Sequence, residues 1–227
     1  MTLNLNDSLG DWLPILQPEF DKEYMKIIGQ RLQSEMKCCP KPENIFNAYR
    51  LTQPSKVKVC VLGMDPYHTP GMAHGLSFST LGTKLPPSLR IIFDELVDSG
   101  LSPKRRTKLD LTDWAEQGVL MLNTILTTRE GNARAHGTWG WQIFTGKTIE
   151  YLAMRPELTV FLAWGNDAID TIKKYSSEGQ NNIVLTSPHP AAQLYGGLKK
   201  FIGNRHFLHT NEFLVKAGLT PIEWHGK

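Results

Sequence analysis

This chain of 227 residues is poor in the features that mark metal-held, secreted and membrane proteins. Its three cysteines are Cys38, Cys39 and Cys60, which form no Cys-x-x-Cys pair and no disulfide framework. No uninterrupted apolar stretch approaches the roughly 20 residues of a membrane-spanning helix, and residues 1–7 lack the basic and apolar parts of a secretory signal. We therefore expect a cytoplasmic protein without a membrane segment.

The chain also lacks repeats, low-complexity segments and linkers, so we expect residues 1–227 to form a single, monomeric domain. The formal charge of +3 permits nucleic-acid binding without requiring it. Hydrophobic residues make up 41% of the chain, which is enough for a packed core. The histidines show no metal-ligand grouping on a helix face or hairpin, so we expect neither a metal nor another cofactor.

Four short apolar runs, at 58–63, 119–122, 160–164 and 183–186, predict buried strands. They are apolar on both faces and separated by helix-like stretches, as is typical of parallel strands between two layers of helices. We expect an α/β fold with a central four-stranded parallel sheet flanked by helices on both faces. Helices are predicted at 19–36, 113–117, 141–154, 167–175 and 204–217. A further helix is predicted from 88 to about 100, with Ser88 as its N-cap. Residues 75–79 are predicted to form a short extended piece.

Each predicted strand runs into residues capable of polar chemistry. Asp65 and His68 follow the first strand, Asn123 the second, and His189 the fourth. Because ligands bind outside the carboxyl ends of the strands in open parallel sheets, these side chains are expected at one crevice.

Each of these residues also has an ordinary structural interpretation. Asp65 precedes Pro66 and could simply begin a turn, and Asn123 could bond its own backbone. His189 could be a packing residue, although the prolines on both sides restrict its backbone. Phe78 could be a core aromatic or could stack on a flat heterocycle. A carboxylate at the end of a buried strand is costly unless it is used, which favours the functional interpretation of Asp65.

The motifs in which these residues lie resemble those of the family-1 uracil-DNA glycosylases. Residues 63–68 (Gly-Met-Asp-Pro-Tyr-His) resemble the family's water-activating signature, and His189-Pro190 resembles the start of its leucine-loop signature. Further blocks match in order and approximate spacing, at 73–79, 86–89, 118–123, 161–165 and 203–207. The resemblance extends from Trp12 to Trp224, and seven blocks in order are highly specific.

The resemblance implies an enzyme that flips uracil out of DNA and hydrolyses its N-glycosidic bond in base-excision repair. Asp65 would polarise the attacking water, and His189 would stabilise the departing uracil anion through O2. Asn123 would read uracil O4 and N3–H, because an amide offers both a donor and an acceptor. Phe78 would stack on the ring, and Tyr67 would exclude the thymine methyl.

The resemblance places supporting roles around this pocket. His68 would support the water site, and Met64, where the family usually has glutamine, would keep only backbone contacts to uracil. Residues expected to contact the DNA backbone are Pro86, Pro87, Ser88, Gly165, Asn166 (usually serine) and Pro190. The implied partners are uracil-containing DNA, single- or double-stranded, and a protein inhibitor that mimics the DNA backbone.

The loop after His189 departs from the family pattern. Ala191 replaces a phosphate-gripping serine, and Gln193 aligns with the intercalating leucine in a loop about two residues longer. An apolar wedge fills the gap left by a flipped base better than an amide does, so we predict Leu194 as the main wedge. The alternative is Gln193, which we otherwise expect to bond neighbouring bases or backbone. Tyr195, Lys199 and Lys200 are further candidates for DNA contact.

Two other classes of function compete with this interpretation. A catalytically weak, DNA-scanning or polymerase-associated relative would explain the altered loop but would not need Asp65, Asn123 and His189 together. An unrelated small-molecule hydrolase on a similar sheet would need a Gly-x-Ser-x-Gly elbow, a phosphate-binding glycine loop or a metal cluster, and the sequence has none of these.

Overall fold

The computed structural model describes residues 5–176, 181–196 and 200–226. Its main sheet has four parallel strands in the order β3-β2-β5-β6. The strands are β2 (Val59–Gly63), β3 (Val119–Asn123), β5 (Thr159–Trp164) and β6 (Asn182–Ser187), within a residue or so of the predicted runs. A two-stranded antiparallel sheet of β1 (Cys38–Cys39) and β4 (Thr128–Arg129) was not expected from the sequence.

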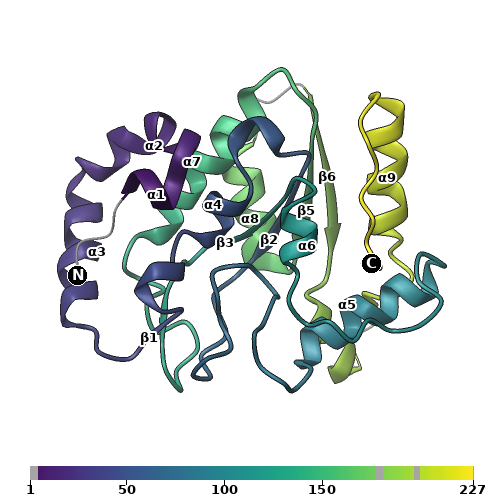
Figure 1. Ribbon diagram of the computed structural model, residues 1–227, viewed down its shortest axis with the longest axis horizontal. Helices are drawn as coiled ribbons and strands as arrows, with labels where there is room; N and C mark the ends of the chain where they lie inside the picture. The colour runs from purple at the N-terminus through teal and green to yellow at the C-terminus, as the bar shows by residue number, and fades with distance from the viewer. Residues whose placement is uncertain (1–4, 177–180, 197–199, 227) are drawn as a thin grey trace.

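Helices cover both faces of the main sheet, as predicted (Figure 1). They are α1 (Leu5–Leu9), α2 (Leu13–Phe20), α3 (Glu23–Ser34), α4 (Asn47–Leu51), α5 (Pro87–Asp98), α6 (Thr112–Ala115), α7 (Trp141–Met154), α8 (Asn166–Tyr175) and α9 (His206–Lys216). Short 3₁₀ turns are η1 (Gly10–Trp12), η2 (Pro42–Asn44), η3 (Pro54–Lys56) and η4 (Pro190–Tyr195). In the described part of the chain, no helix combines the length and apolarity that crossing a membrane requires.

Three local predictions were wrong. The helix expected at 19–36 is two helices, because Lys22 adopts an extended conformation between α2 and α3. Helix α5 begins at Pro87 with Pro86 as its N-cap, so Ser88 lies inside the first turn; proline suits the first helical position because its φ is already helical. Residues 75–79 form a loop without a strand, in which Phe78 has a φ of 62°.

Burial differs between the strands in a way that the sequence pattern did not predict. All residues of β2, β3 and β5 are buried, whereas β6 lies at one edge of the sheet and leaves Val184 40% exposed. The sheet core continues into aromatic side chains on α9 and near the C-terminus, including Phe207 and Trp224. The parallel pairing brings Gly63 opposite Asn123, so the residues after β2 and β3 emerge at one edge.

Candidate active site

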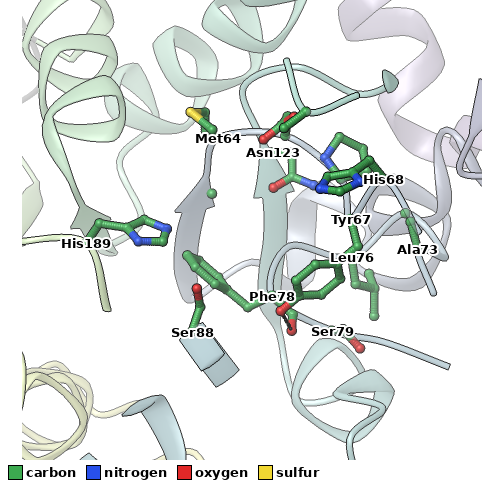
Figure 2. A pocket seen from close by; sticks show the side chains of 15 residues that line it. Met64, Tyr67, His68, Ala73, Leu76, Phe78, Ser79, Ser88, Asn123 and His189 are labelled. Atoms are coloured by element: carbon green, nitrogen blue, oxygen red, sulfur yellow. Dashed lines mark hydrogen bonds between the residues drawn. The ribbon is translucent and has the colours of Figure 1, made fainter. Parts of the chain in front are cut away.

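A cavity of about 160 Å³ lies at the carboxyl ends of the strands (Figure 2). It unites the predicted uracil-pocket residues from four separate segments of the chain. Its lining includes Met64, Asp65, Tyr67, His68, Phe78, Ser88, Asn123 and His189. Figure 2 shows Asn123 and His189 reaching the cavity from different sides, with the Phe78 ring near its floor.

The Asp65 carboxylate is held by a backbone group from a distant loop. The N–H of Arg134 donates to Asp65 Oδ2 at 2.6 Å. Burial raises the pKa of Asp65 above 3.8, and the Arg134 N–H opposes this rise because it stabilises the charged form. The bond also fixes the orientation of the carboxylate, which suits a group that must align a water molecule.

The His189 ring is held as a neutral hydrogen-bond donor. Burial lowers the pKa of His189 below 6.5, so the ring is neutral at pH 7. The N–H of Ala191 donates to Nδ1 at 3.2 Å, which assigns the ring proton to Nε2. His189 therefore has one N–H to offer a developing negative charge, and it needs no protonation to do so.

The Asn123 amide is buried at the end of β3, with 6% of the residue exposed. Its side chain has no hydrogen-bond partner within the described residues, and its amide atoms are not among the fully buried unpaired ones, so they are accessible from the cavity. Gly63 makes room for it, because a Cβ at that position would clash with Asn123 Oδ1. The amide is therefore free to pair with a molecule that has a donor beside an acceptor.

Phe78 is placed by an unusual backbone conformation. A φ of 62° is rare for a bulky residue and commonly marks a functional site. The Tyr67 hydroxyl donates to the Phe78 carbonyl at 3.0 Å, which ties the two aromatic residues together. The Phe78 ring packs at 5.5 Å from Trp164 and 5.9 Å from His189. A flat ligand in the cavity can therefore stack on a rigid aromatic floor.

His68 and Met64 lie at the border of the cavity. His68 is exposed, and its carbonyl accepts the Gly131 N–H at 2.9 Å. The Met64 carbonyl accepts the N–H of Ile125 and the hydroxyl of Thr124, both at 2.9 Å. These bonds fix the backbone of the 63–68 segment against the residues after β3.

The expected DNA-backbone contacts surround the cavity to different extents. Pro86 is buried, Pro87 is exposed, and Ser88 is half-buried and lines the cavity. Gly165 adopts a φ of 97°, and a Cβ there would lie 3.0 Å from His189 Cβ. Asn166 is exposed at the first position of α8.

The loop after His189 turns its side chains in different directions. Gln193 Oε1 accepts the N–H groups of Phe201 at 2.7 Å and Ile202 at 3.3 Å, so this oxygen is engaged within the protein rather than free for DNA. Leu194 is 40% exposed and Tyr195 is 85% exposed. Pro190 is buried and Ala191 half-buried, whereas Lys200 is exposed; Lys199 lies outside the described residues.

Sequence reasoning missed Arg134 because its contribution to Asp65 is a backbone N–H, which leaves no signal in residue type. It also missed Ala73, Leu76 and Ala133, which line the cavity. Among the described residues, no group of three or more His, Cys, Asp and Glu side chains could hold a metal ion.

Comparisons with known proteins agree with this geometry. The sequence model of the Uracil DNA glycosylase superfamily matches residues 50–215. The uracil-DNA glycosylase of Idiomarina loihiensis is 41% identical, over 94% of this chain and 99% of that protein. That of Levilactobacillus brevis is 44% identical, over 95% and 90%.

Solved structures show the same relationship. The crystal structure of mimivirus uracil-DNA glycosylase aligns with a TM-score of 0.87 and 27% identity, covering 98% of this chain and 89% of that one. A mimivirus UNG variant in complex with UGI aligns with a TM-score of 0.85, also at 27% identity, covering 98% of this chain and 91% of that one. The chain therefore belongs to the uracil-DNA glycosylase superfamily.

Proposed function

We propose that this protein is a monofunctional uracil-DNA glycosylase, which excises uracil from DNA and leaves an abasic site for base-excision repair. The observation that carries the proposal is the convergence of a carboxylate, a partnerless amide and a neutral imidazole on one cavity with an aromatic floor. These are Asp65, Asn123, His189 and Phe78. A flipped-out base needs such a pocket, because contacts there must repay the cost of unstacking.

Recognition of uracil rests on three side chains. The Asn123 amide would pair with O4 and N3–H, while cytosine presents the reversed pattern at these positions. Phe78 would stack on the ring. Tyr67, held to Phe78 by its hydroxyl, would occupy the space beside C5 and exclude the methyl group of thymine.

Asp65 and His189 would have separate roles in the hydrolysis. Asp65 would orient and polarise the attacking water and stabilise positive charge on the sugar, with His68 supporting the water at the border of the cavity. The Nε2–H of His189 would bond uracil O2 as the N-glycosidic bond breaks and the base leaves with the bonding electrons. The protein backbone at Met64 would contribute a further contact to uracil.

DNA binding would use the rim of the cavity. Pro87, Ser88 and Asn166 are accessible there, and the exposed Lys200 is a cation suited to a phosphate. The conformation of the protein backbone at the rim would depend mainly on Gly165, Pro86, Pro190 and Ala191. Lys199 is a further candidate for contact with DNA. We propose monomeric action on single- or double-stranded DNA. A protein inhibitor that mimics the DNA backbone would compete for the same face, a proposal that the UGI complex of the mimivirus variant supports.

The excision assay tests the function directly. We expect the protein, in excess chelator, to release uracil from a single-uracil duplex, because its own residues supply every step above. Alkali should then cleave the strand at the abasic site. The matched control is the same duplex with thymine, which should stay intact. No release with chelator, or strand cleavage before alkali is added, would contradict the proposed mechanism.

The η4 turn offers a second test, which concerns the wedge. We propose that Leu194, joined by the more exposed Tyr195, fills the gap left by the flipped base, while Gln193 tethers the turn to residues 201 and 202. Leu194→Ala and Tyr195→Ala should each slow excision from duplex more than from single strands, because only the duplex has a gap.

The control for the wedge is Val184→Ala, which removes an apolar side chain with the same 40% exposure as Leu194 from β6. It should affect both substrates equally. If neither loop variant distinguishes duplex from single strands, the wedge lies elsewhere.

A further inference from the structure

An ion pair at the rim of the cavity takes no part in the steps proposed above. Arg134 Nη2 donates to Asp167 Oδ1 at 2.9 Å, with 55% and 49% of the two side chains exposed. Arg134 follows Ala133, which lines the cavity, and its own N–H binds Asp65. Asp167 lies in the first turn of α8, two residues after Gly165, which packs against His189. The pair therefore joins the Asp65 side of the rim to the His189 side.

Asp167 puts a negative charge where a polyanion must approach. Its neighbour Asn166 is a proposed DNA-backbone contact, so a free carboxylate beside it would repel phosphates. The position has a structural reason, since an acidic residue in the first turn of a helix is favourable. Arg134 neutralises this charge in the free protein.

Arg134 is also suited to leave Asp167. Its backbone is fixed, with a φ of 59° and its N–H bound to Asp65, so the residue stays at the rim while its side chain moves. The guanidinium is more than half exposed, and a solvent-exposed ion pair holds its partners only weakly. Its planar set of donors matches a phosphate at least as well as a carboxylate.

We propose that Arg134 is a DNA-contact residue that exchanges Asp167 for a backbone phosphate beside the flipped nucleotide, and that Asp167 competes with DNA for it. The inference rests on the proposed function, because it needs DNA as the substrate. It makes Asp167 a residue that weakens DNA binding, although it lies on the DNA-binding face.

The sign of the effect at Asp167 is the test. Asp167→Asn should lower KM for a uracil duplex by about two- to fivefold, the range that an exposed ion pair allows, with kcat little changed. Arg134→Gln keeps the length and the backbone N–H but removes the charge. This variant should raise KM and should reduce the slope of log KM against log salt concentration by about the amount that one phosphate contact contributes. The double variant should have a KM between those of Asp167→Asn and Arg134→Gln, because Arg134→Gln alone leaves the Asp167 carboxylate unpaired beside the phosphates.

Glu150→Gln is the matched control, because it removes one negative charge from another exposed pair, Lys147–Glu150 on α7. A fall in KM as large as that of Asp167→Asn would assign the effect to net charge and overturn the proposal. A rise in KM for Asp167→Asn would overturn it too, by showing that the pair is a structural clasp. If the unmodified protein releases no uracil at all, the proposed function fails instead, which keeps the two failures distinct.

Discussion

Asp65→Asn should slow single-turnover uracil excision by about 10²–10⁴-fold, the range that a positioned acid–base group contributes. Asparagine keeps the shape and can still accept the Arg134 N–H, so the loop should stay in place. The loss would then come from the missing negative charge, which can neither polarise water nor stabilise a positively charged sugar. The rate is measured with enzyme in excess over labelled duplex, by stopping the reaction at successive times and determining the fraction of uracil excised.

The pH profile separates this role from a structural one. Burial raises the pKa of Asp65, so excision should fall as the pH drops through a value above 3.8, where the carboxylate takes up a proton. Above that value the carboxylate is ionised and the rate should level off. The rate of Asp65→Asn should no longer fall at low pH in this way. The control is Asp21→Asn, which changes an exposed carboxylate and should keep both the rate and the pH profile. A rate within a few-fold of the unmodified protein would mean that Asp65 has been misassigned.

His189→Leu should slow the same step by about 10²–10³-fold, as expected on removing one donor to a developing anion. The donor that this substitution removes is the Nε2–H, because Nδ1 already accepts the Ala191 N–H. His189→Gln offers an amide N–H from a similar position, so it should recover part of the lost rate. His209→Leu removes an exposed histidine from α9 and should leave the rate unchanged.

Protonation gives a further check on His189. Burial lowers its pKa below 6.5, so the neutral donor should persist through neutral pH and the rate should show no step near 6.5. In nuclear magnetic resonance spectra, Nδ1 should lack a proton at pH 7. A protonated Nδ1 at that pH, or an unchanged rate in His189→Leu, would contradict a neutral electrophile.

The strands could be predicted from sequence because their apolar runs are short and uninterrupted. For β2, β3 and β5 the burial on both faces followed as expected, since helices cover the sheet there. It did not follow for β6, which leaves Val184 exposed, although β3 lies at the other edge of the sheet and is fully buried. An apolar run alone does not reveal whether other elements cover an edge strand. Helix starts were less predictable, and Lys22 divides one amphipathic pattern into two helices.

Much of the cavity could also be predicted, since its polar groups come directly after strands. Parallel strands end at the same edge, so Asp65, Asn123 and His189 had to lie near one another once the sheet was parallel. The resemblance in residues 63–68, 118–123 and 189–190 supplied their roles. The resemblance also supplied Phe78 as the stacking ring, but its left-handed backbone and its packing on Trp164 needed the structure, because they arise from contacts distant in sequence.

The sequence by itself determined where the strands run and which chemical groups follow them, because both depend on residue types at neighbouring positions. Only the tertiary structure decided how those groups are held. The Arg134 N–H on Asp65 joins residues 69 positions apart, and Gln193 turns inward to bond residues 201 and 202. Arg134 and Asp167 meet only because the fold brings their two segments together. Backbone donors and long-range ion pairs carry no local pattern, so they become visible only when the chain is folded.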